Sequence, residues 1–442
     1  MPCLPETSPF SAAAGRAESF QADIIDKGTF MHHFQLRNGQ LMADDLPVTE
    51  LAREFGTPLY VYSASTLRRH YEAFDSAFAA IPHLTCFSVK CNPNLGVLGL
   101  LRSQGAGADI VSGGELHRCL AAGMDPKKIV FSGVGKQAHE LRQALEAGIL
   151  MFNVESGPEL ELLSQVAQAA GMTADISLRI NPDVDPKTHP YISTGLQKNK
   201  FGIGMDEALE LYALARDLPS LEPVGIDCHI GSQLTEISPF LETLERLLKL
   251  YRELRELGLP ISYLDLGGGL GITYNEEDPP HPQEFGQALT DALKGVELKL
   301  ILEPGRVIAG NAGIMVTQVL RTKNTPLKHF VIVDGAMNDL IRPSLYGAFH
   351  RISEVVPHHR DLIKTDVVGP ICETGDFLAQ DRELPGVESG EYLAVFSAGA
   401  YGFAMSSQYN ARPRAAEVLV DGSQARLVRR RESYEDLIAL EE

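Results

Sequence analysis

Short apolar runs alternate with helical patterns through the middle of the chain. Eight such runs lie between residues 84 and 303, and each is rich in β-branched or aliphatic side chains. They are Leu84–Val89, Ala108–Val111, Ile129–Phe131, Ile149–Val154, Ile176–Ile180, Val224–Cys228, Tyr263–Leu266 and Leu300–Leu302. Runs this short are typical of parallel strands that are buried on both faces rather than of helices.

The segments between the runs carry helical periodicity. The clearest is residues 239–257, where leucines recur every three or four positions and charged residues fill the other face. Ser238 is the predicted N-cap, Pro239 suits the first helical position, and Gly258 suits the C-terminal cap. A second helix is predicted over residues 137–147. Eight strands alternating with helices predict a (β/α)8 barrel, with a doubly wound open sheet as the alternative.

The two ends of the chain show a different pattern. Residues 30–43 hold two short runs around Asn38-Gly39, which is a strong hairpin signal. Further short strands separated by turn residues are predicted after residue 306. They are Ile314–Leu320, Phe330–Val333, Tyr392–Phe396, Val418–Val420 and Leu427-Val428. This pattern indicates a β-rich domain at both ends of the chain.

The predicted fold is therefore α/β, with a (β/α)8 TIM-like barrel inserted in a second, mainly β domain built from both chain ends. The predicted barrel covers residues 57–305, and the β-rich domain combines residues 29–56 with residues 306–442. Residues 1–28 show no strong periodicity and are predicted to be a flexible tail.

Composition and charge limit the partners. The net charge of -19 disfavours nucleic acid and anionic membrane surfaces. No apolar run approaches membrane-spanning length, and no basic region precedes an apolar core as in a secretory signal. The six cysteines show neither paired spacing nor a zinc pattern, which favours reduced thiols in the cytoplasm and no metal site.

Functional groups stand at the carboxyl ends of four predicted strands. These are Lys90, His229, the glycine cluster 267–271 and Glu303 with the neighbouring Arg306. The carboxyl ends of barrel strands share one face, so these groups should meet there. In a water-poor site an amine such as that of Lys90 can lose its proton and hold an aldehyde cofactor as an imine.

Each of these groups also has an ordinary structural interpretation. Lys90 could be a solvated lysine and His229 a satisfied core histidine. The glycine cluster 267–271 could be a plain turn rather than a phosphate cradle, and Glu303 could form an ion pair with Arg306. The coincidence of four groups on one face favours a functional site.

Four motifs resemble those of the pyridoxal-phosphate decarboxylases of the alanine-racemase-like fold. They are Phe87-Ser-Val-Lys90-Cys-Asn92, His229-Ile-Gly-Ser-Gln233, Gly267-Gly-Gly-Leu-Gly271 and Glu303-Pro-Gly-Arg306. Downstream motifs narrow the resemblance to the diaminopimelate decarboxylases within that family. They are Asp339-Leu-Ile-Arg342-Pro-Ser-Leu-Tyr346-Gly-Ala348, Cys372-Glu373-Thr-Gly-Asp376, Gly399-Ala-Tyr401-Gly402 and Tyr409-Asn-Ala-Arg412-Pro-Arg.

The resemblance implies a pyridoxal 5'-phosphate site. Lys90 would hold the cofactor covalently, His229 would stack on its ring, and Glu303 would pair with the ring nitrogen. The implied cofactor-binding set is Lys90, Asp109, His229, Ser232, Gly269, Glu303, Gly305, Arg306 and Tyr401.

The resemblance also implies a substrate site shared between two subunits. The implied substrate-binding set is Arg306, Arg342, Tyr346, Glu373 and Tyr401. Cys372 would be the proton donor, reaching with Glu373 from the second subunit of a homodimer. The alternatives are a buried structural cysteine for Cys372 and a surface ion pair of Arg342 with Asp339.

The implied substrate is meso-2,6-diaminopimelate, which would yield L-lysine and CO2. Its far end carries a carboxylate that suits a guanidinium and an ammonium that suits a carboxylate. The remaining alternatives are a decarboxylase of another diamino acid, such as ornithine, arginine or carboxynorspermidine, and a catalytically inactive regulatory homologue.

Overall fold

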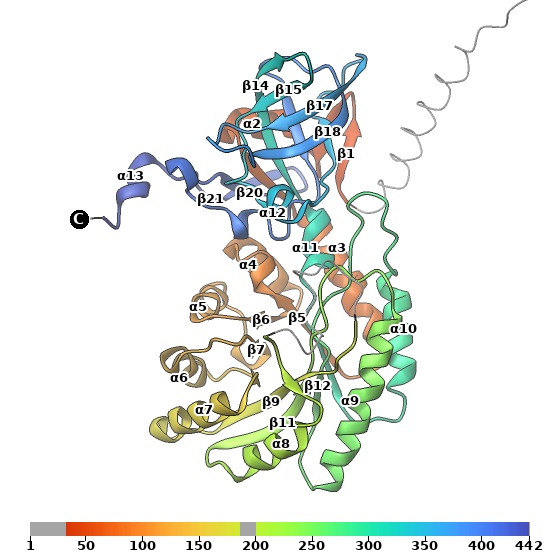
Figure 1. Cartoon of the computed structure of the whole chain (residues 1–442), viewed down its shortest axis with the longest axis vertical. Helices are drawn as coiled ribbons and strands as arrows, with labels where there is room; N and C mark the ends of the chain where they lie inside the picture. The colour runs from red at the N-terminus through yellow and green to blue at the C-terminus, as the bar shows by residue number, and fades with distance from the viewer. Residues whose placement is uncertain (1–31, 186–199, 442) are drawn as a thin grey trace, which may run out of the picture.

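The computed structural model describes residues 32–185 and 200–441. Within these residues, eight parallel strands close into a barrel, and a mainly β domain packs at one end of it (Figure 1). The predicted tail, residues 1–28, lies outside the described residues.

The barrel follows the predicted order of strands. Its strands are β5 (His83–Ser88), β6 (Gly107–Ile110), β7 (Ile129–Phe131), β8 (Met151–Val154), β9 (Ala174–Asn181), β11 (Leu221–Asp227), β12 (Tyr263–Asp265) and β13 (Lys299–Leu302). Each coincides with one of the eight apolar runs. The parallel pairings of β13 with β5 and of β8 with β9 close the ring, so the open-sheet alternative is wrong. A short strand, β10 (Ile203–Gly204), extends β9 at its carboxyl end.

Helices surround the barrel between successive strands. They are α3 (Ala64–Asp75), α4 (Leu95–Ser103), α5 (Gly113–Ala121), α6 (Ala138–Ala147), α7 (Gly157–Ala170), α8 (Ala208–Asp217), α9 (Ser238–Glu256), α10 (Pro282–Ala292) and the short α11 (Arg306–Ala309). α6 confirms the helix predicted over residues 137–147.

One predicted cap is wrong. The N-cap of α9 is Ile237, whose backbone is already helical, so Ser238 is the first helical residue. The Ser238 hydroxyl donates to Glu236 Oε2 at 3.3 Å and does not cap a backbone amide. Gly258 has a left-handed φ of 78°, as a residue after a helix C-terminus requires.

The second domain is built around a mixed sheet with the strand order β18-β17-β15-β14-β4-β20-β21. These strands are β4 (Leu59–Ser63), β14 (Gly313–Asn324), β15 (His329–Val333), β17 (Leu362–Val368), β18 (Phe377–Pro385), β20 (Ala416–Asp421) and β21 (Gln424–Arg429). β16 (Ile352–Glu354) pairs with β19 (Tyr392–Val395), which joins β14. The helices α12 (Arg342–Tyr346) and α13 (Tyr434–Ile438) also belong to this part of the chain.

The N-terminal part adds a small sheet. β1 (Phe34–Arg37) and β2 (Gln40–Ala43) form the predicted hairpin, and both turn residues, Asn38 and Gly39, have positive φ. β3 (Leu46–Pro47) and α2 (Val48–Phe55) follow.

The predicted start of the barrel at residue 57 is wrong, because β4 belongs to the second domain. It lies inside the second sheet, antiparallel to β14 and parallel to β20. All five of its residues are buried, so their hydropathy pattern carries no information about which sheet they join.

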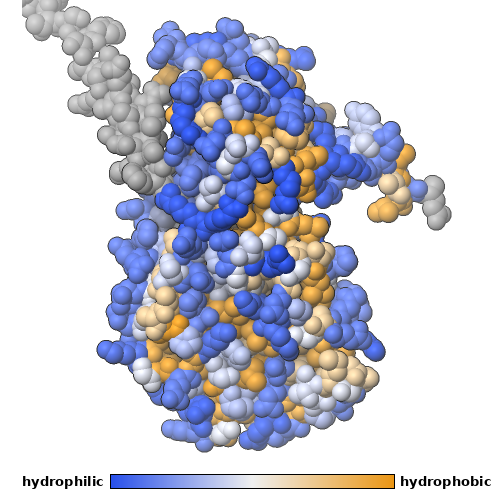
Figure 2. Space-filling model, turned by 180° about the vertical axis from the view of Figure 1, so that it is seen from behind, coloured by the Kyte–Doolittle hydropathy of each residue, from blue (hydrophilic) through white to orange (hydrophobic). Residues whose placement is uncertain are grey.

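The surface of the described residues is largely hydrophilic when the molecule is seen from behind (Figure 2). Apolar atoms are also visible on the C-terminal segment, which contains α13 and projects from the β domain. Among the residues that the structure describes, no helix is both long enough and apolar enough to cross a bilayer.

Gly399 lies where the two domains meet. Its carbonyl accepts a hydrogen bond from Asn92 Nδ2 at 2.9 Å, two residues after Lys90. A Cβ added to Gly399 would lie 2.0 Å from the carbonyl oxygen of Ala309, which is backbone and has no freedom to turn aside. This joint therefore requires a glycine.

We expect Gly399→Ala to destabilise the fold by about 1–3 kcal/mol through overpacking. Urea unfolding followed by circular dichroism measures the change. Gly99→Ala is the matched control, because Gly99 lies in α4 with nothing within 4 Å of an added Cβ. Alanine there should be neutral or stabilising by up to about 1 kcal/mol. Equal stability of the two variants would contradict the packing argument.

Candidate active site

Lys90 and Asp109 form an ion pair at the carboxyl ends of neighbouring strands. Lys90 lies in the single turn Val89–Cys91 directly after β5, and its Nζ is 2.7 Å from Asp109 Oδ2. Ser88 Oγ donates to the same oxygen at 2.7 Å. Asp109 is fully buried, and its Oδ1 has no hydrogen-bond partner within residues 32–185 and 200–441. Lys90 is therefore paired with a buried carboxylate, while 32% of its side chain stays exposed.

The pKa of Lys90 moves in the direction opposite to that expected from a water-poor site alone. Burial disfavours the charged amine, but the charges of Asp109 and Glu303 outweigh burial and hold the pKa above its usual range. The amine is thus charged in this arrangement and has to give up a proton before it can act as a nucleophile.

Glu303 follows β13 and is buried. Its Oε1 accepts hydrogen bonds from Ser132 Oγ at 3.3 Å and from Asn153 Nδ2 at 3.5 Å. Arg306 donates to other groups, so the predicted alternative of an ion pair with Arg306 is wrong. Burial raises the pKa of Glu303 well above its usual value, and the neighbouring charges of Asp109 and Asp265 raise it further.

The glycine cluster is more than a plain turn. Gly267 and Gly269 have left-handed φ values of 65° and 117°. A Cβ added to Gly268 would lie 2.2 Å from the carbonyl oxygen of Glu303, and one added to Gly269 would lie 2.6 Å from that of Gly231. The absence of side chains therefore lets the backbone of these loops approach closely, as a phosphate cradle requires.

His229 is a neutral histidine next to this cluster. Its Nδ1 accepts a hydrogen bond from the Gly268 amide at 3.1 Å. Burial, and then the positive charges of Arg179 and Lys90, lower the pKa of His229 well below its usual value. The ring is thus held in one tautomer at the barrel mouth.

Arg306 joins several of the predicted cofactor-binding groups. Its Nη2 donates to Ser232 Oγ at 3.0 Å and its Nη1 to Tyr274 Oη at 2.5 Å. The ring of Tyr401 lies 4.9 Å from the guanidinium, and the Tyr401 amide donates to the Cys91 carbonyl. Tyr401 has a left-handed φ of 56°, a strained conformation that concentrates at functional sites.

Arg342 is buried at the start of α12. Its Nε donates to His350 Nε2 at 3.3 Å, and the other nitrogen of that ring bonds to the Phe396 carbonyl. The predicted surface ion pair with Asp339 is wrong, because both residues are buried and the structure pairs them with other groups. The Arg342 guanidinium lies over the rings of Tyr274 at 5.1 Å and Tyr346 at 5.8 Å.

Tyr274 was not predicted, although it contacts both arginines. It lies three residues beyond the glycine cluster, and that proximity is the only signal that the sequence offers.

Cys372 and Glu373 lie on the surface, in the loop between β17 and β18. The exposed thiol excludes the buried structural cysteine that the sequence left open. The Cys372 amide donates to Asn410 Oδ1 at 2.8 Å, and Glu373 Oε2 accepts from Tyr409 Oη at 2.7 Å. Within one chain, no hydrogen bond or ion pair of the described residues joins this loop to Lys90.

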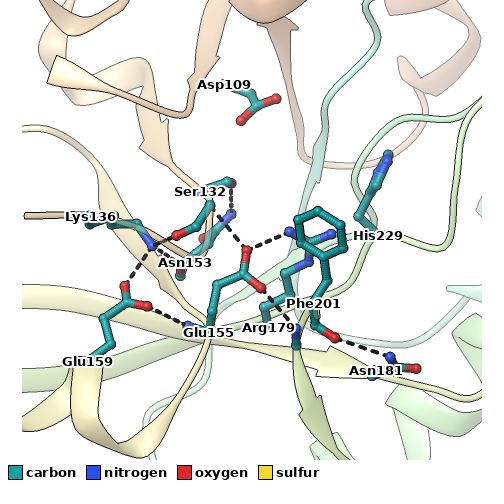
Figure 3. Close-up of polar contacts among 12 residues, drawn as sticks. Asp109, Ser132, Lys136, Asn153, Glu155, Glu159, Arg179, Asn181, Phe201 and His229 are labelled. Atoms are coloured by element: carbon teal, nitrogen blue, oxygen red, sulfur yellow. Dashed lines mark hydrogen bonds and ion pairs between the residues drawn. The ribbon is translucent and has the colours of Figure 1, made fainter. Parts of the chain in front are cut away.

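A buried ionic network at the barrel mouth also escaped the sequence analysis (Figure 3). Glu155 Oε1 accepts from Arg179 Nη1 at 2.6 Å, and Glu155 Oε2 accepts from the Gly202 amide. The Arg179 guanidinium lies 4.9 Å from the ring of Phe201, which ties the segment before β10 to the mouth. These charges lie apart in the sequence, and the pairing of the neighbouring strands β8 and β9 brings them together.

Three buried carboxylates gather beneath the mouth. Oxygens of Asp227, Asp265 and Glu303 lie within 4.8 Å of one another. Asn153 Nδ2 donates to Asp265 at 3.3 Å as well as to Glu303, so one amide orients two of the acids.

The barrel matches a known family model. Residues 64–310 match the pyridoxal binding domain of the pyridoxal-dependent decarboxylases. The fold and the match together define this chain as a pyridoxal-phosphate-dependent decarboxylase. The residues present fit the cofactor, since an amine, a glycine-lined loop and a buried acid converge and two buried atoms, Asp109 Oδ1 and Arg306 Nε, lack partners among the described residues.

Comparisons with whole proteins narrow the family. The chain is 54% identical over 413 residues to diaminopimelate decarboxylase of Haemophilus influenzae, covering 93% of this chain and 99% of that protein. It is 56% identical over 405 residues to the Vibrio cholerae enzyme, covering 91% and 97%. The structure of diaminopimelate decarboxylase from Helicobacter pylori complexed with L-lysine superposes with a TM-score of 0.86 at 44% identity, covering 89% and 99%. The chain belongs to the diaminopimelate decarboxylase family, which consists of carboxy-lyases.

The pH dependence of stability tests the environment of Glu303. Because its pKa is raised on folding, the folded chain binds this proton more tightly than the unfolded chain. The resulting stabilisation is complete below the unfolded pKa of about 4.3 and is lost as the pH rises through the folded value. We therefore expect cofactor-free Glu303→Gln to gain stability relative to wild type as the pH rises from 4 to 8, measured by urea unfolding.

The same substitution should lower decarboxylase activity by about 100-fold or more, as loss of a preorganised charge does. A stability difference between Glu303→Gln and wild type that is constant across the pH range would contradict a raised pKa of Glu303 in the folded chain.

Proposed function

We propose that this chain converts meso-2,6-diaminopimelate to L-lysine and CO2, the last step of lysine biosynthesis by the diaminopimelate route, as a cytoplasmic homodimer. The observation that carries the choice of substrate is the pair Arg306 and Arg342. Both are buried, both contact the Tyr274 ring, and neither forms an ion pair with a carboxylate among the described residues. Two buried guanidinium groups without carboxylate partners favour a ligand that brings carboxylates.

The proposed roles at the cofactor follow the geometry. When bound, pyridoxal phosphate supplies an electron sink for the charge left at the α-carbon after CO2 departs. Lys90 would hold the cofactor, and Asp109 would accept the proton that the amine gives up. His229, neutral and oriented by Gly268, would cover the ring, and Glu303 would pair with the ring nitrogen.

The phosphate would lie among Ser232, Gly269, Gly305 and Arg306. Support comes from the hydrogen bond of Arg306 to Ser232 and from the close backbone approach at Gly269. Gly305 also needs to be small, since an added Cβ would lie 3.0 Å from the Ser88 side chain. Tyr401 would complete the pocket beside Arg306.

The substrate end would be held by Arg342, Tyr346, Glu373, Arg306 and Tyr401. Arg342 is suited to a carboxylate because His350, itself fixed by the Phe396 carbonyl, leaves its terminal nitrogens for a ligand. Glu373 would receive the distal ammonium.

Cys372 would donate the proton to the α-carbon from the second subunit. Its exposure, and its lack of contact with Lys90 in its own chain, support a role in a neighbouring subunit. Reduced thiols at Cys86, Cys91, Cys119, Cys228 and Cys372 support a cytoplasmic location.

CO2 release from meso-diaminopimelate tests these roles. Lys90→Ala should be nearly inactive, because it removes the amine that is proposed to hold the cofactor. Cys372→Ala should lose about 10²- to 10⁴-fold in turnover, the usual contribution of a general acid, but keep its cofactor absorbance. Full activity in Cys372→Ala would remove it from the mechanism.

Mixing the two inactive variants tests the shared site. Subunits of Lys90→Ala and Cys372→Ala that reassort at random should regain about a quarter of wild-type activity, since half the dimers carry one intact site. No regain after verified exchange of subunits would show that the two residues act within one chain.

Substrate preference tests Arg342. Arg342→Met should lower kcat/KM for meso-diaminopimelate by roughly 10- to 100-fold, the loss expected for a charged hydrogen bond. Its activity on ornithine, which lacks the distal carboxylate, should not fall. Arg142→Met is the control, because Arg142 is exposed on α6, and it should change neither the activity on meso-diaminopimelate nor the activity on ornithine.

A wild-type preference for ornithine, arginine or carboxynorspermidine would instead favour a decarboxylase of another diamino acid. A regulatory homologue would show no imine absorbance and no change on borohydride treatment. Presence of both Lys90 and Cys372 favours the active enzyme.

A further inference from the structure

The C-terminal segment, residues 430–441, forms an arm that projects from the β domain (Figure 1). Its apolar side chains face outward, and Tyr434, Ile438 and Leu440 are 75%, 61% and 99% exposed. Figure 2 shows hydrophobic, orange atoms on the projecting C-terminal segment. Large apolar side chains that gather on one protruding element mark an interaction surface.

The arm is built to hold its shape. The Ser433 hydroxyl accepts from the Asp436 amide, and Asp436 accepts from the Ser433 amide in return. Arg430 also binds both oxygens of the Asp436 carboxylate. A five-residue helix is too short to be stable by itself, so these contacts hold its shape.

The base of the arm is bonded to the loops that carry the proposed proton donor. Gln408 Nε2 donates to Glu432 Oε2 at 2.9 Å. The next two residues, Tyr409 and Asn410, bind Glu373 and the Cys372 amide. The arm and the Cys372 loop therefore form one continuous edge of the β domain.

A partly apolar hollow lies along α4, next to the β20–β21 hairpin. A hollow of about 520 Å³ between α4 and β20–β21 is lined by Leu95, Leu100 and Leu419, with Arg102 and Arg426 among its polar groups. Leu95 is 44% exposed and begins α4, at the barrel end where Lys90 lies.

We propose that, in the homodimer, the arm of each subunit packs into the α4 hollow of the other. The inference rests on the proposed function, in which Cys372 of one subunit reaches Lys90 of the other. Bringing these residues together also brings the arm, which is rooted beside Cys372, to α4, which begins beside Lys90. The arm carries four acidic residues against Arg430 and Arg431, and the hollow carries Arg102 and Arg426 against Asp421, so the two surfaces have a modest opposite charge.

A second copy of this chain is the occupant, because the root of the arm is bonded to the Cys372 loop, and the shared site brings that loop of one subunit to the other subunit. The arm is thus a positioning element. By packing on the other subunit, it holds the Cys372 loop of its own chain over Lys90 of that subunit, and it takes no part in the chemistry itself.

Sedimentation velocity of the holoenzyme over a range of concentrations tests the proposal. Ile438→Glu on the arm and Leu95→Glu in the hollow should each raise the dimer dissociation constant roughly tenfold or more, because two-fold symmetry counts each lost contact twice. Leu440→Glu is a second arm variant. Leu327→Glu is the matched control, since Leu327 is 92% exposed in the turn between β14 and β15, and it should stay within about twofold of wild type.

Activity of the arm variants should fall at low protein concentration and return to the wild-type value at high concentration. An unchanged dissociation constant in both arm variants overturns the proposal, and so does equal weakening by Leu327→Glu or no weakening by Leu95→Glu. Matching circular dichroism and thermal midpoints exclude misfolding. The activity regained on mixing Lys90→Ala with Cys372→Ala tests the shared site without involving the arm. Failure of the proposed function can therefore be distinguished from failure of the proposed arm contact.

Discussion

Burial of charge inside the barrel is the constraint on which the site depends. Asp109, Asp227, Asp265 and Glu303 lie where water is largely excluded, and isolated carboxylates there would be costly. The Lys90 amine pairs with Asp109, and the Asn153 amide donates to Asp265 and Glu303. Burial also raises the pKa of Asp227, Asp265 and Glu303, so protonation removes part of the remaining charge. The result is a rigid electrostatic frame at the carboxyl ends of the strands, and it requires no movement of the chain to be in place.

The frame also explains why the second domain is needed. Barrel residues supply the amine, the acid and the glycine loops. Tyr401, Arg342 and the Cys372 loop come from the β domain. The amide of Tyr401 is bonded to the Cys91 carbonyl, so the two parts of the site are joined one residue away from Lys90. In the proposed roles, chemistry common to many amino acids would lie in the barrel, and most of the groups that recognise a particular substrate would come from the β domain.

Much of this arrangement could be predicted from the sequence because the barrel strands have a recognisable pattern. Each is a short apolar run, and its functional residue follows it directly, as Lys90 follows β5 and Glu303 follows β13. The domain to which β4 belongs was not predicted, because a wholly buried strand has the same hydropathy pattern in either sheet. The ion pair of Glu155 with Arg179 was missed because it depends on the register and side-chain directions of the neighbouring strands β8 and β9. The sign of the Lys90 pKa shift needed the distance to Asp109, which no spacing reveals.

The position of β4 has a consequence for how the protein is made. This fully buried strand is synthesised early, but both of its sheet neighbours come later: β14 begins at Gly313 and β20 at Ala416. At a synthesis rate of roughly 5–20 residues per second, β4 waits tens of seconds for its second partner. Until β14 is made, both edges of this strand lack their sheet partners, and one edge stays unpaired until β20 follows. The central sheet of the β domain can therefore be completed only after the whole barrel has been synthesised.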